Sequence, residues 1–260
     1  MTDPVQQFIH ERRQQIAGYS LDMTFSAQSQ AWLEASMRRR YVYNYDWLGR
    51  PIIQYPQDIM AMQELVWLTR PDLIIETGIA HGGSLVLSAS LLAMLDYCDA
   101  ADTGTTLDPK ASKRKVLGLD IDIRPHNREA IESHPLAHKI DMIQGSSISP
   151  EVIGKVHAYA KNYQRVMVCL DSNHTHEHVL AELHAYARLT TAGCYCLVFD
   201  TFVEDMPTDL FLDRPWAPGN NPKTAVWEYL KSHPEFEIDK SIQHKLLITV
   251  APDGFLRRII

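Results

Sequence analysis

Cysteine is scarce in this sequence, and its spacing does not fit a metal-binding motif. The 260 residues include only Cys98, Cys169, Cys194 and Cys196, and no two of them form a CxxC pair. A structural zinc site of the usual kind is therefore not expected. Cys194 and Cys196 share one face of a strand-like run, which favours packing over redox chemistry.

An excess of basic residues and a long hydrophobic run are also lacking. Lys and Arg number 25 against 32 Asp and Glu, which gives a formal net charge of -7. Proteins that bind nucleic acid through phosphates usually present a strong basic patch, so no nucleic-acid partner is expected. The longest apolar run, residues 85–95, is shorter than the roughly 20 residues that span a bilayer. The N-terminal residues lack the apolar core of a secretory signal. We therefore expect a cytoplasmic protein without a membrane partner.

Short apolar runs alternate with helical stretches from residue 71 onward. This rhythm predicts an α/β fold with a doubly wound, mostly parallel sheet that is covered by helices on both faces. The predicted strands are 73–76, 116–120, 141–145, 166–171, 195–200 and 245–250. The predicted helices are 83–97, 127–133, 150–162, 176–190 and 222–232.

Two segments stand outside this rhythm. Residues 1–60 combine polar helical stretches with a run rich in aromatic residues and proline, which indicates an ordered N-terminal cap on a main domain formed by residues 61–260. Residues 99–114 are polar and poor in apolar side chains, so we predict a mobile loop inserted before the second strand.

A glycine-rich turn joins the first predicted strand to an apolar helix. Glycines allow the backbone to approach a ligand closely, and a helix N-terminus offers unpaired N–H groups to an anionic group. The turn has the pattern E-x-G-x-x-x-G-x-S and not the G-x-G-x-x-G of dinucleotide-binding proteins. His81 in this turn either contacts the ligand or is merely tolerated. The candidate ligand-binding residues here are Glu76, Gly78, His81, Gly82 and Ser84.

The second predicted strand ends at Asp120, and Asp122 follows two residues later. An acidic residue at this point can accept hydrogen bonds from ribose hydroxyls. Together with the turn, it suits an adenosyl ligand that carries an amino acid, with Glu76 near the ammonium group and Asp120 at the ribose.

Two carboxylates are expected to meet where the chemistry takes place. Asp171 ends the fourth predicted strand and Asp200 the fifth, and the carboxyl ends of parallel strands meet at one edge of the sheet. Such a pair can hold a Mg²⁺-type cation, which prefers oxygen ligands and stabilises a developing alkoxide. In the alternative interpretation, both residues only cap the segments that follow their strands.

Three histidines follow Asp171 in the sequence SNHTHEH. His174 can serve as a general base. A second interpretation is an iron site of two histidines and one carboxylate, formed by His174, His176 and Asp171.

The chain resembles the cephalosporin hydroxylase-like and rhamnosyl O-methyltransferase family of S-adenosylmethionine (SAM)-dependent methyltransferases. The resemblance covers most of the chain beyond residue 40 and implies SAM binding and methyl transfer to an oxygen of a sugar or secondary metabolite. The segments that carry it are YDWLGRPIIQYPQD (45–58), IIETGIAHGGSL (74–85), LGLDIDIRPHNREAI (117–131), IQGSS (143–147), LDSNHTHEHVLAEL (170–183), VFDT (198–201) and PWAPGNNPKTAVWEYL (215–230).

The resemblance also implies a metal site made of an acidic residue after the fourth strand and an acidic pair after the fifth. Asp171 matches the first, and Asp200 matches one member of the pair, but Phe199 stands in place of the other. Glu204 or Thr201 is a possible replacement for that acid.

The acceptor is expected to lie under the N-terminal segment and residues 205–221. The candidate contact residues are Tyr45, Trp47, Gln54, Asp58 and Trp216. Alternatively, the aromatic members form the core of the cap or a subunit interface.

The sequence thus predicts a SAM-dependent O-methyltransferase that is assisted by Mg²⁺ and acts on a small molecule. Ser146 joins the expected SAM contacts, and a homo-oligomer is expected. An iron-dependent hydroxylase and a SAM-binding subunit without turnover are the alternatives.

Overall fold

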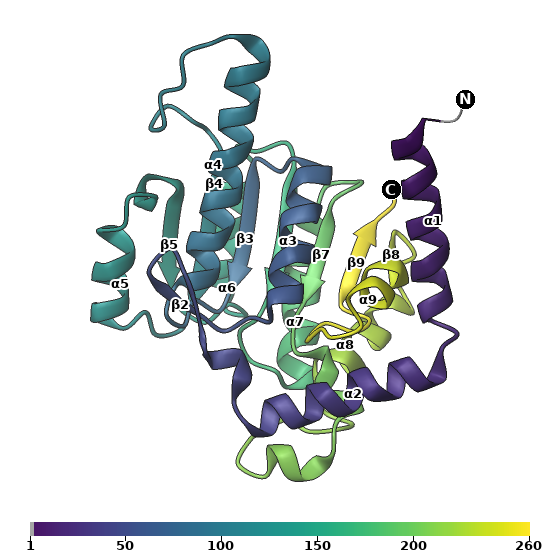
Figure 1. Ribbon diagram of the computed structural model, residues 1–260. Coiled ribbons are helices and arrows are strands. Elements are labelled where there is room, and N and C mark those ends of the chain that lie inside the picture. Colours follow the sequence, from purple (N-terminus) through teal and green to yellow (C-terminus); the bar gives the residue numbers. More distant parts are fainter. Residues whose placement is uncertain (1–2) are drawn as a thin grey trace.

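A seven-stranded sheet forms the centre of the computed structural model, which describes residues 3–260 (Figure 1). The strand order is β5-β4-β3-β6-β7-β9-β8. The first five strands of that order run parallel, whereas β9 pairs antiparallel with both β7 and β8. The predicted α/β fold with a mostly parallel sheet is confirmed. The strands are β3 (Leu73–Thr77), β4 (Lys115–Asp120), β5 (Ile140–Gln144), β6 (Val166–Leu170), β7 (Tyr195–Val198), β8 (Phe236–Ile238) and β9 (Phe255–Arg258).

Different helices cover the two faces of the sheet. Alternate residues of each buried strand point to opposite faces, so one strand contributes to the hydrophobic clusters on both. In β3, Ile74 belongs to one hydrophobic cluster, and Leu73 and Ile75 belong to the other. The first face carries α3 (Pro56–Thr69) and α4 (Gly83–Thr103), with α5 (Pro125–Glu132) and α9 (Lys240–Leu246) at its ends. The second face carries α6 (Pro150–Ala160), α7 (His176–Tyr186) and α8 (Pro222–Leu230).

The strand order reverses beside β3. The chain passes from β3 to β4 and β5 on one side, and then returns to β6 and β7 on the other side of β3. In open α/β sheets, ligands bind outside the carboxyl ends of the strands at such a reversal. Figure 1 shows α2 (Met23–Arg38) and the green segment after β7 beyond these strand ends.

The N-terminal segment is packed into the main fold. It contains α1 (Pro4–Tyr19), α2, and a small antiparallel hairpin of β1 (Tyr45–Trp47) and β2 (Arg50–Ile52). Ile52 and Tyr55 are buried in the same hydrophobic cluster as α4. The boundary at residue 60 stays a prediction.

The predicted strand at 245–250 is wrong. Residues 240–246 form α9, which starts after Asp239, whose side chain accepts a hydrogen bond from the Ser241 N–H. The apolar residues at the end of the run are buried as a loop, since the Val250 N–H donates to Asp58 at 3.0 Å. The sheet is completed instead by the short strands β8 and β9.

The predicted loop at 99–114 is helical in its first part, because α4 continues to Thr103. By length and composition α4 is also apolar enough to cross a membrane, as core helices of α/β proteins often are. Here its Leu85 and Leu92 are buried in the hydrophobic core. Arg114, at the end of the segment, forms ion pairs with Asp96 at 2.6 Å and Asp99 at 2.7 Å. Mobility of residues 104–113 stays a prediction.

We expect Asp96→Asn to lower the free energy of unfolding by about 1–3 kcal/mol, the scale of charged hydrogen bonds. Burial acts to raise the pKa of Asp96, but hydrogen bonds from Lys139, Ser112 and Arg114 outweigh burial and lower it. A lowered carboxyl pKa stabilises the fold above the unfolded value, about 3.9. This stabilisation is lost as the pH falls through the lower, folded-state pKa.

Urea unfolding of the wild type and the variant at several pH values measures this effect. The difference between them should be largest near neutral pH and should shrink in acid. Asp102→Asn, at an exposed position of the same helix, is the control. An equal loss in both variants would contradict the role of Asp96.

Candidate active site

One cavity of about 940 Å³ opens at the carboxyl ends of β3, β6 and β7. Its inner part is lined by the turn after β3 and by the residues that follow β6 and β7. Its outer part is lined by the end of α2, residues 51–54 and the segment 202–216. The cavity therefore lies where the strand order predicts a ligand site.

The turn between β3 and α4 is packed so closely that it requires glycine. Gly78 has φ +89°, and a Cβ placed there would lie 2.0 Å from the carbonyl oxygen of Asp171. Gly82 has φ +84°, and a Cβ there would meet the side chain of Ile131 at 2.5 Å. Positive φ values and close approaches of this kind favour glycine. The turn thus brings the end of β3 against the start of the segment after β6.

Asp120 shapes this turn from the neighbouring strand. Its Oδ2 accepts hydrogen bonds from the N–H groups of Ile79 at 2.8 Å and Ala80 at 3.4 Å, and its Oδ1 accepts one from Asp122 at 3.0 Å. Within residues 3–260, Asp120, Asp122 and Ser146 are absent from the cavity lining. Asp120 therefore supports the ligand-binding turn, and direct contact of these three with SAM stays a prediction.

Glu76 and Asp58 are buried carboxyl groups beneath the cavity. They line a small adjoining space of about 20 Å³, together with Asp171. Glu76 accepts a hydrogen bond from Ser84, and Asp58 accepts one from Thr249. Burial raises the pKa of each to about 7. Asp58 thus fixes the loop before β9, and it lies outside the main cavity in which we expected an acceptor contact.

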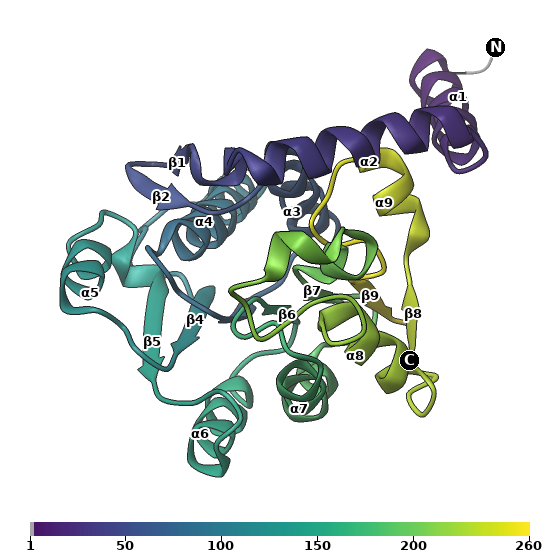
Figure 2. The same ribbon diagram turned by 90° about the horizontal axis from the view of Figure 1, so that it is seen from below.

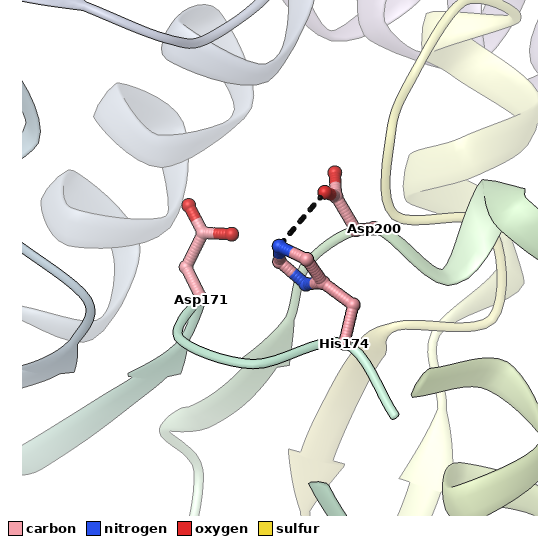
Figure 3. Close-up of side chains that lie close together, drawn as sticks. All are labelled: Asp171, His174 and Asp200. Atoms are coloured by element: carbon pink, nitrogen blue, oxygen red, sulfur yellow. Dashed lines mark ion pairs between the residues drawn. The ribbon is translucent and has the colours of Figure 1, made fainter. Parts of the chain in front are cut away.

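Asp171, His174 and Asp200 meet at the floor of the cavity (Figure 3). Each offers a ligand atom within 4.8 Å of the others, and His174 Nε2 lies 3.2 Å from Asp200 Oδ2. Burial raises the pKa of Asp171, and the negative charge of Asp200 raises it further. The Gln54 amide reaches Asp171 at 3.5 Å, and the ring of Trp216 packs edge-on against His174 at 4.8 Å.

Asp200 has a backbone conformation that non-glycine residues rarely adopt. Its φ of 55° lies in the left-handed region, at the start of the 3₁₀ segment η4 (Thr201–Asp205). Strained residues of this kind concentrate at functional sites. Two carboxylates and one imidazole, with Asp171 and His174 after β6 and Asp200 after β7, can bind a divalent cation or move a proton.

The other two histidines do not join this cluster. His176 lies 2.8 Å from the Thr224 hydroxyl and 3.2 Å from Glu228, so it faces α8. His178 contacts Glu182 at 3.4 Å. The iron site that we considered, with both His174 and His176 as ligands, is therefore not formed.

The structure also keeps the expected replacements for the missing acid away from the cluster. Glu204 accepts hydrogen bonds from the Gly219 N–H at 2.7 Å and from the Asn221 amide. The Thr201 hydroxyl donates to the carbonyl of Pro252 at 2.6 Å. Glu204 therefore supports the turn before α8, and the geometry does not favour it as a metal ligand. Phe199 is buried, with 7% of its surface exposed.

Only some of the expected acceptor contacts line the cavity. Gln54 and Trp216 do, whereas Tyr45 packs against Tyr41 with ring centres 5.4 Å apart, and Trp47 donates to Ser90 at 3.0 Å. Tyr45 and Trp47 thus follow the alternative in which aromatic residues form the core of the cap. The cofactor candidates Gly78, His81 and Ser84 line the cavity as well. Leu210, Phe211 and Arg214 line the cavity from the segment 205–221, which we expected over the acceptor, although none of the three was singled out. Arg40 and Phe202 were not predicted as lining residues.

Comparison with known proteins places the chain in one family. The family description "Rhamnosyl O-methyltransferase/CmcI" matches residues 39–259. A rhamnosyl O-methyltransferase of Mycobacterium leprae is 27% identical over 216 residues, which are 82% of this chain and 82% of the relative. A rhamnosyl O-methyltransferase of Mycobacterium tuberculosis is 27% identical over 206 residues, which are 77% of this chain and 73% of the relative.

Solved structures of CmcI share the fold. An apo-structure of CmcI superposes with a TM-score of 0.54 and 17% identity, over 84% of this chain and 77% of that one. A CmcI structure with Mg and SAM superposes with a TM-score of 0.52 and 18% identity, over 84% and 78%. The family match over residues 39–259 is consistent with the sheet and with the glycine turn at its reversal point. The chain belongs to the rhamnosyl O-methyltransferase/CmcI family of SAM-dependent methyltransferases.

Proposed function

We propose that the protein transfers the methyl group of SAM to a hydroxyl group of a sugar or secondary metabolite, with a Mg²⁺-type cation bound by Asp171 and Asp200. The observation that carries this proposal is the Asp171–His174–Asp200 cluster, which shares one cavity with the glycine turn after β3. Ligand pockets are typically about 300–1,000 Å³, so a cavity at the upper end of this range suits a cofactor and an acceptor side by side.

The residues that would hold SAM belong to the turn after β3. No side chain of residues 3–260 caps the N-terminus of α4, so its first N–H groups are available to a carboxylate such as that of the methionine part. Gly78, His81 and Ser84 line this end of the cavity. A CmcI structure with the same fold holds SAM and Mg, in agreement with the proposal.

The donor set fits a divalent cation, since Asp171 and Asp200 supply the oxygen ligands that Mg²⁺ prefers. Such a cation, when bound, stabilises negative charge on the acceptor oxygen. The Gln54 amide orients Asp171, and Asp200 orients His174 through the 3.2 Å contact. His174 accepts the hydroxyl proton as the oxygen attacks the methyl carbon and the bond from that carbon to sulfur breaks. The role that we assign to the cavity walls is to position the acceptor oxygen in line with the methyl group and the sulfur.

Methyl transfer from isotopically labelled SAM to a panel of glycosides and hydroxylated aromatic compounds tests the function. Labelled methyl ether and S-adenosylhomocysteine (SAH) should form in equal amounts, and only with acceptors that carry a free hydroxyl. Methylation of a nitrogen or carbon atom, or binding of SAH without turnover on any hydroxyl compound, would contradict the proposal.

We expect Asp120→Ala to weaken SAM binding by about 1–3 kcal/mol, because the turn after β3 loses the hydrogen bonds that Asp120 accepts from Ile79 and Ala80. Calorimetric titration with SAH measures the change. Glu129→Ala removes an exposed carboxylate of α5, outside the cavity lining of the described residues, and is the control. Unchanged affinity in Asp120→Ala would show that the turn keeps its shape without this residue.

A further inference from the structure

The cavity carries charges of opposite sign at its two ends. Asp171 and Asp200 lie after β6 and β7, whereas the outer wall carries Arg40 and Arg214 and one acid, Asp213. A third lining arginine, Arg124, follows β4 at the cofactor end of the cavity. The whole chain has a net charge of -7, so a wall with two arginines does not follow from a basic composition.

Arg40 and Arg214 come from separate segments that pack together over the acceptor end of the cavity. Arg40 follows α2, and Arg214 follows the 3₁₀ segment η5 (Thr208–Phe211). Figure 2 shows α2 passing beside the green segment that contains η5. Arg38 of α2 forms an ion pair with Asp209 of that segment at 2.8 Å, which links the two.

Both guanidinium groups lie over an aromatic ring, and neither has a hydrogen-bond acceptor within residues 3–260. The Arg40 guanidinium lies 5.1 Å from the centre of the Tyr43 ring, and that of Arg214 lies 5.4 Å from the centre of the Trp216 ring. Asp213, which also lines the cavity, lies 3.9 Å from the Arg214 Nε, beyond hydrogen-bond distance, and both side chains are exposed.

Stacking occupies the flat face of a guanidinium and leaves its N–H groups, which lie along the edge, available for a planar or tetrahedral anion. Carboxylate and phosphate groups match this edge geometry with two parallel hydrogen bonds. Trp216 also contacts His174, so its ring lies next to both the Arg214 guanidinium and the reacting end of the cavity.

We propose that Arg40 and Arg214 bind an anionic group, a carboxylate or a phosphate, carried by the methyl acceptor. The acceptor class is then an acidic or phosphorylated sugar, or a comparable ring compound, whose anion lies away from the methylated hydroxyl. That the bound anion belongs to the methyl acceptor rests on the proposed methyl transfer. The anion site itself can be tested by binding alone.

The test uses the full chain saturated with SAH and three probes: glucuronate, glucose 6-phosphate and uncharged methyl glucoside. Binding is followed by tryptophan fluorescence, since Trp216 lines the site, and by ligand-observed NMR. At least one anionic probe should bind about tenfold more tightly than methyl glucoside, and this preference should weaken as salt is raised. Whichever anion binds more tightly identifies the carboxylate or the phosphate as the natural group.

Arg40→Gln and Arg214→Gln should each weaken binding of the preferred anion about tenfold and change methyl glucoside binding less than twofold. Arg40→Lys keeps the charge without the planar edge, so its affinity should fall between those of the wild type and Arg40→Gln. Arg39→Gln is the matched control, because Arg39 is the neighbouring exposed arginine and is absent from the cavity lining of the described chain.

Equal binding of all three probes to the wild type would overturn the inference, as would an equal loss in Arg39→Gln and Arg40→Gln. These outcomes differ from failure of the proposed function. If SAH itself does not bind, the methyl-transfer proposal fails; if SAH binds and the anion preference is absent, only the acceptor class fails.

Discussion

Asp171→Asn is expected to lower the rate of methyl transfer by about 10²–10⁴-fold, while the affinity for SAH changes little. Asn keeps the shape of the side chain but removes the negative charge that a divalent cation requires. Asp171 stands between Gln54 and the His174–Asp200 pair, so its charge acts on the reacting end of the cavity.

Single-turnover methyl transfer and calorimetric titration with SAH separate the two effects. A chelator should reproduce the loss in the wild type, and added Mg²⁺ should restore activity there but not in the variant. Glu129→Gln, which removes an exposed carboxylate of α5 outside the cavity lining of the described residues, should remain active. If chelation has no effect and Asp171→Asn is inactive, the metal proposal fails and Asp171 acts as a base. A fully active Asp171→Asn enzyme would place the chemistry elsewhere.

Gly78→Ala is expected to lower the free energy of unfolding by about 2–5 kcal/mol and to weaken SAH binding at least tenfold. Two costs combine: the left-handed backbone conformation, about 1–2 kcal/mol for a residue with a Cβ, and the relief of a steric overlap, about 1–3 kcal/mol. The new Cβ would lie 2.0 Å from the Asp171 carbonyl oxygen, so the turn and the segment after β6 must separate.

Gly193→Ala isolates the conformational part of this effect. Gly193 has φ +82°, close to the +89° of Gly78, but a Cβ placed on Gly193 would meet no atom within 4 Å. Thermal or urea unfolding should therefore show a smaller loss in Gly193→Ala and an unchanged SAH affinity. Equal losses of unfolding free energy in the two variants would mean that the close approach of Gly78 to Asp171 adds nothing to the conformational cost of the new Cβ.

The buried parallel strands could be predicted because they are continuous apolar runs that end in Asp or in a glycine turn. The same rule misassigned residues 245–250, where the apolar run is buried as a loop that Asp58 holds through Val250. The strands β8 and β9 were missed, since they are short and contain exposed charged residues. Apolar content indicates burial, but it does not by itself indicate a pairing partner.

The acids at the strand ends were also foreseeable, because topology alone brings Asp171 and Asp200 to one edge. The roles of Asp58 and Glu204 were not, since each is decided by a hydrogen-bond partner outside its own segment, Thr249 for Asp58 and Asn221 for Glu204. The same holds for the histidines: only the folded loop directs His174 to the cluster and His176 toward α8. Arg40 and Arg214 are 174 positions apart in the numbering, and no local pattern connects them.

The close packing at Gly83 has a consequence for how molecules enter and leave the cavity. A Cβ at Gly83 would lie 2.3 Å from the Pro51 carbonyl, so the chain at 51–52 rests directly on the start of α4. This close packing holds the 51–52 segment in place against α4. The opposite wall, η5 and the residues after it, is held to α2 by exposed contacts such as the Arg38–Asp209 pair. Acceptors and products should therefore enter and leave the cavity on the side of η5. Substitutions meant to widen the range of acceptors are best made at residues 207–214.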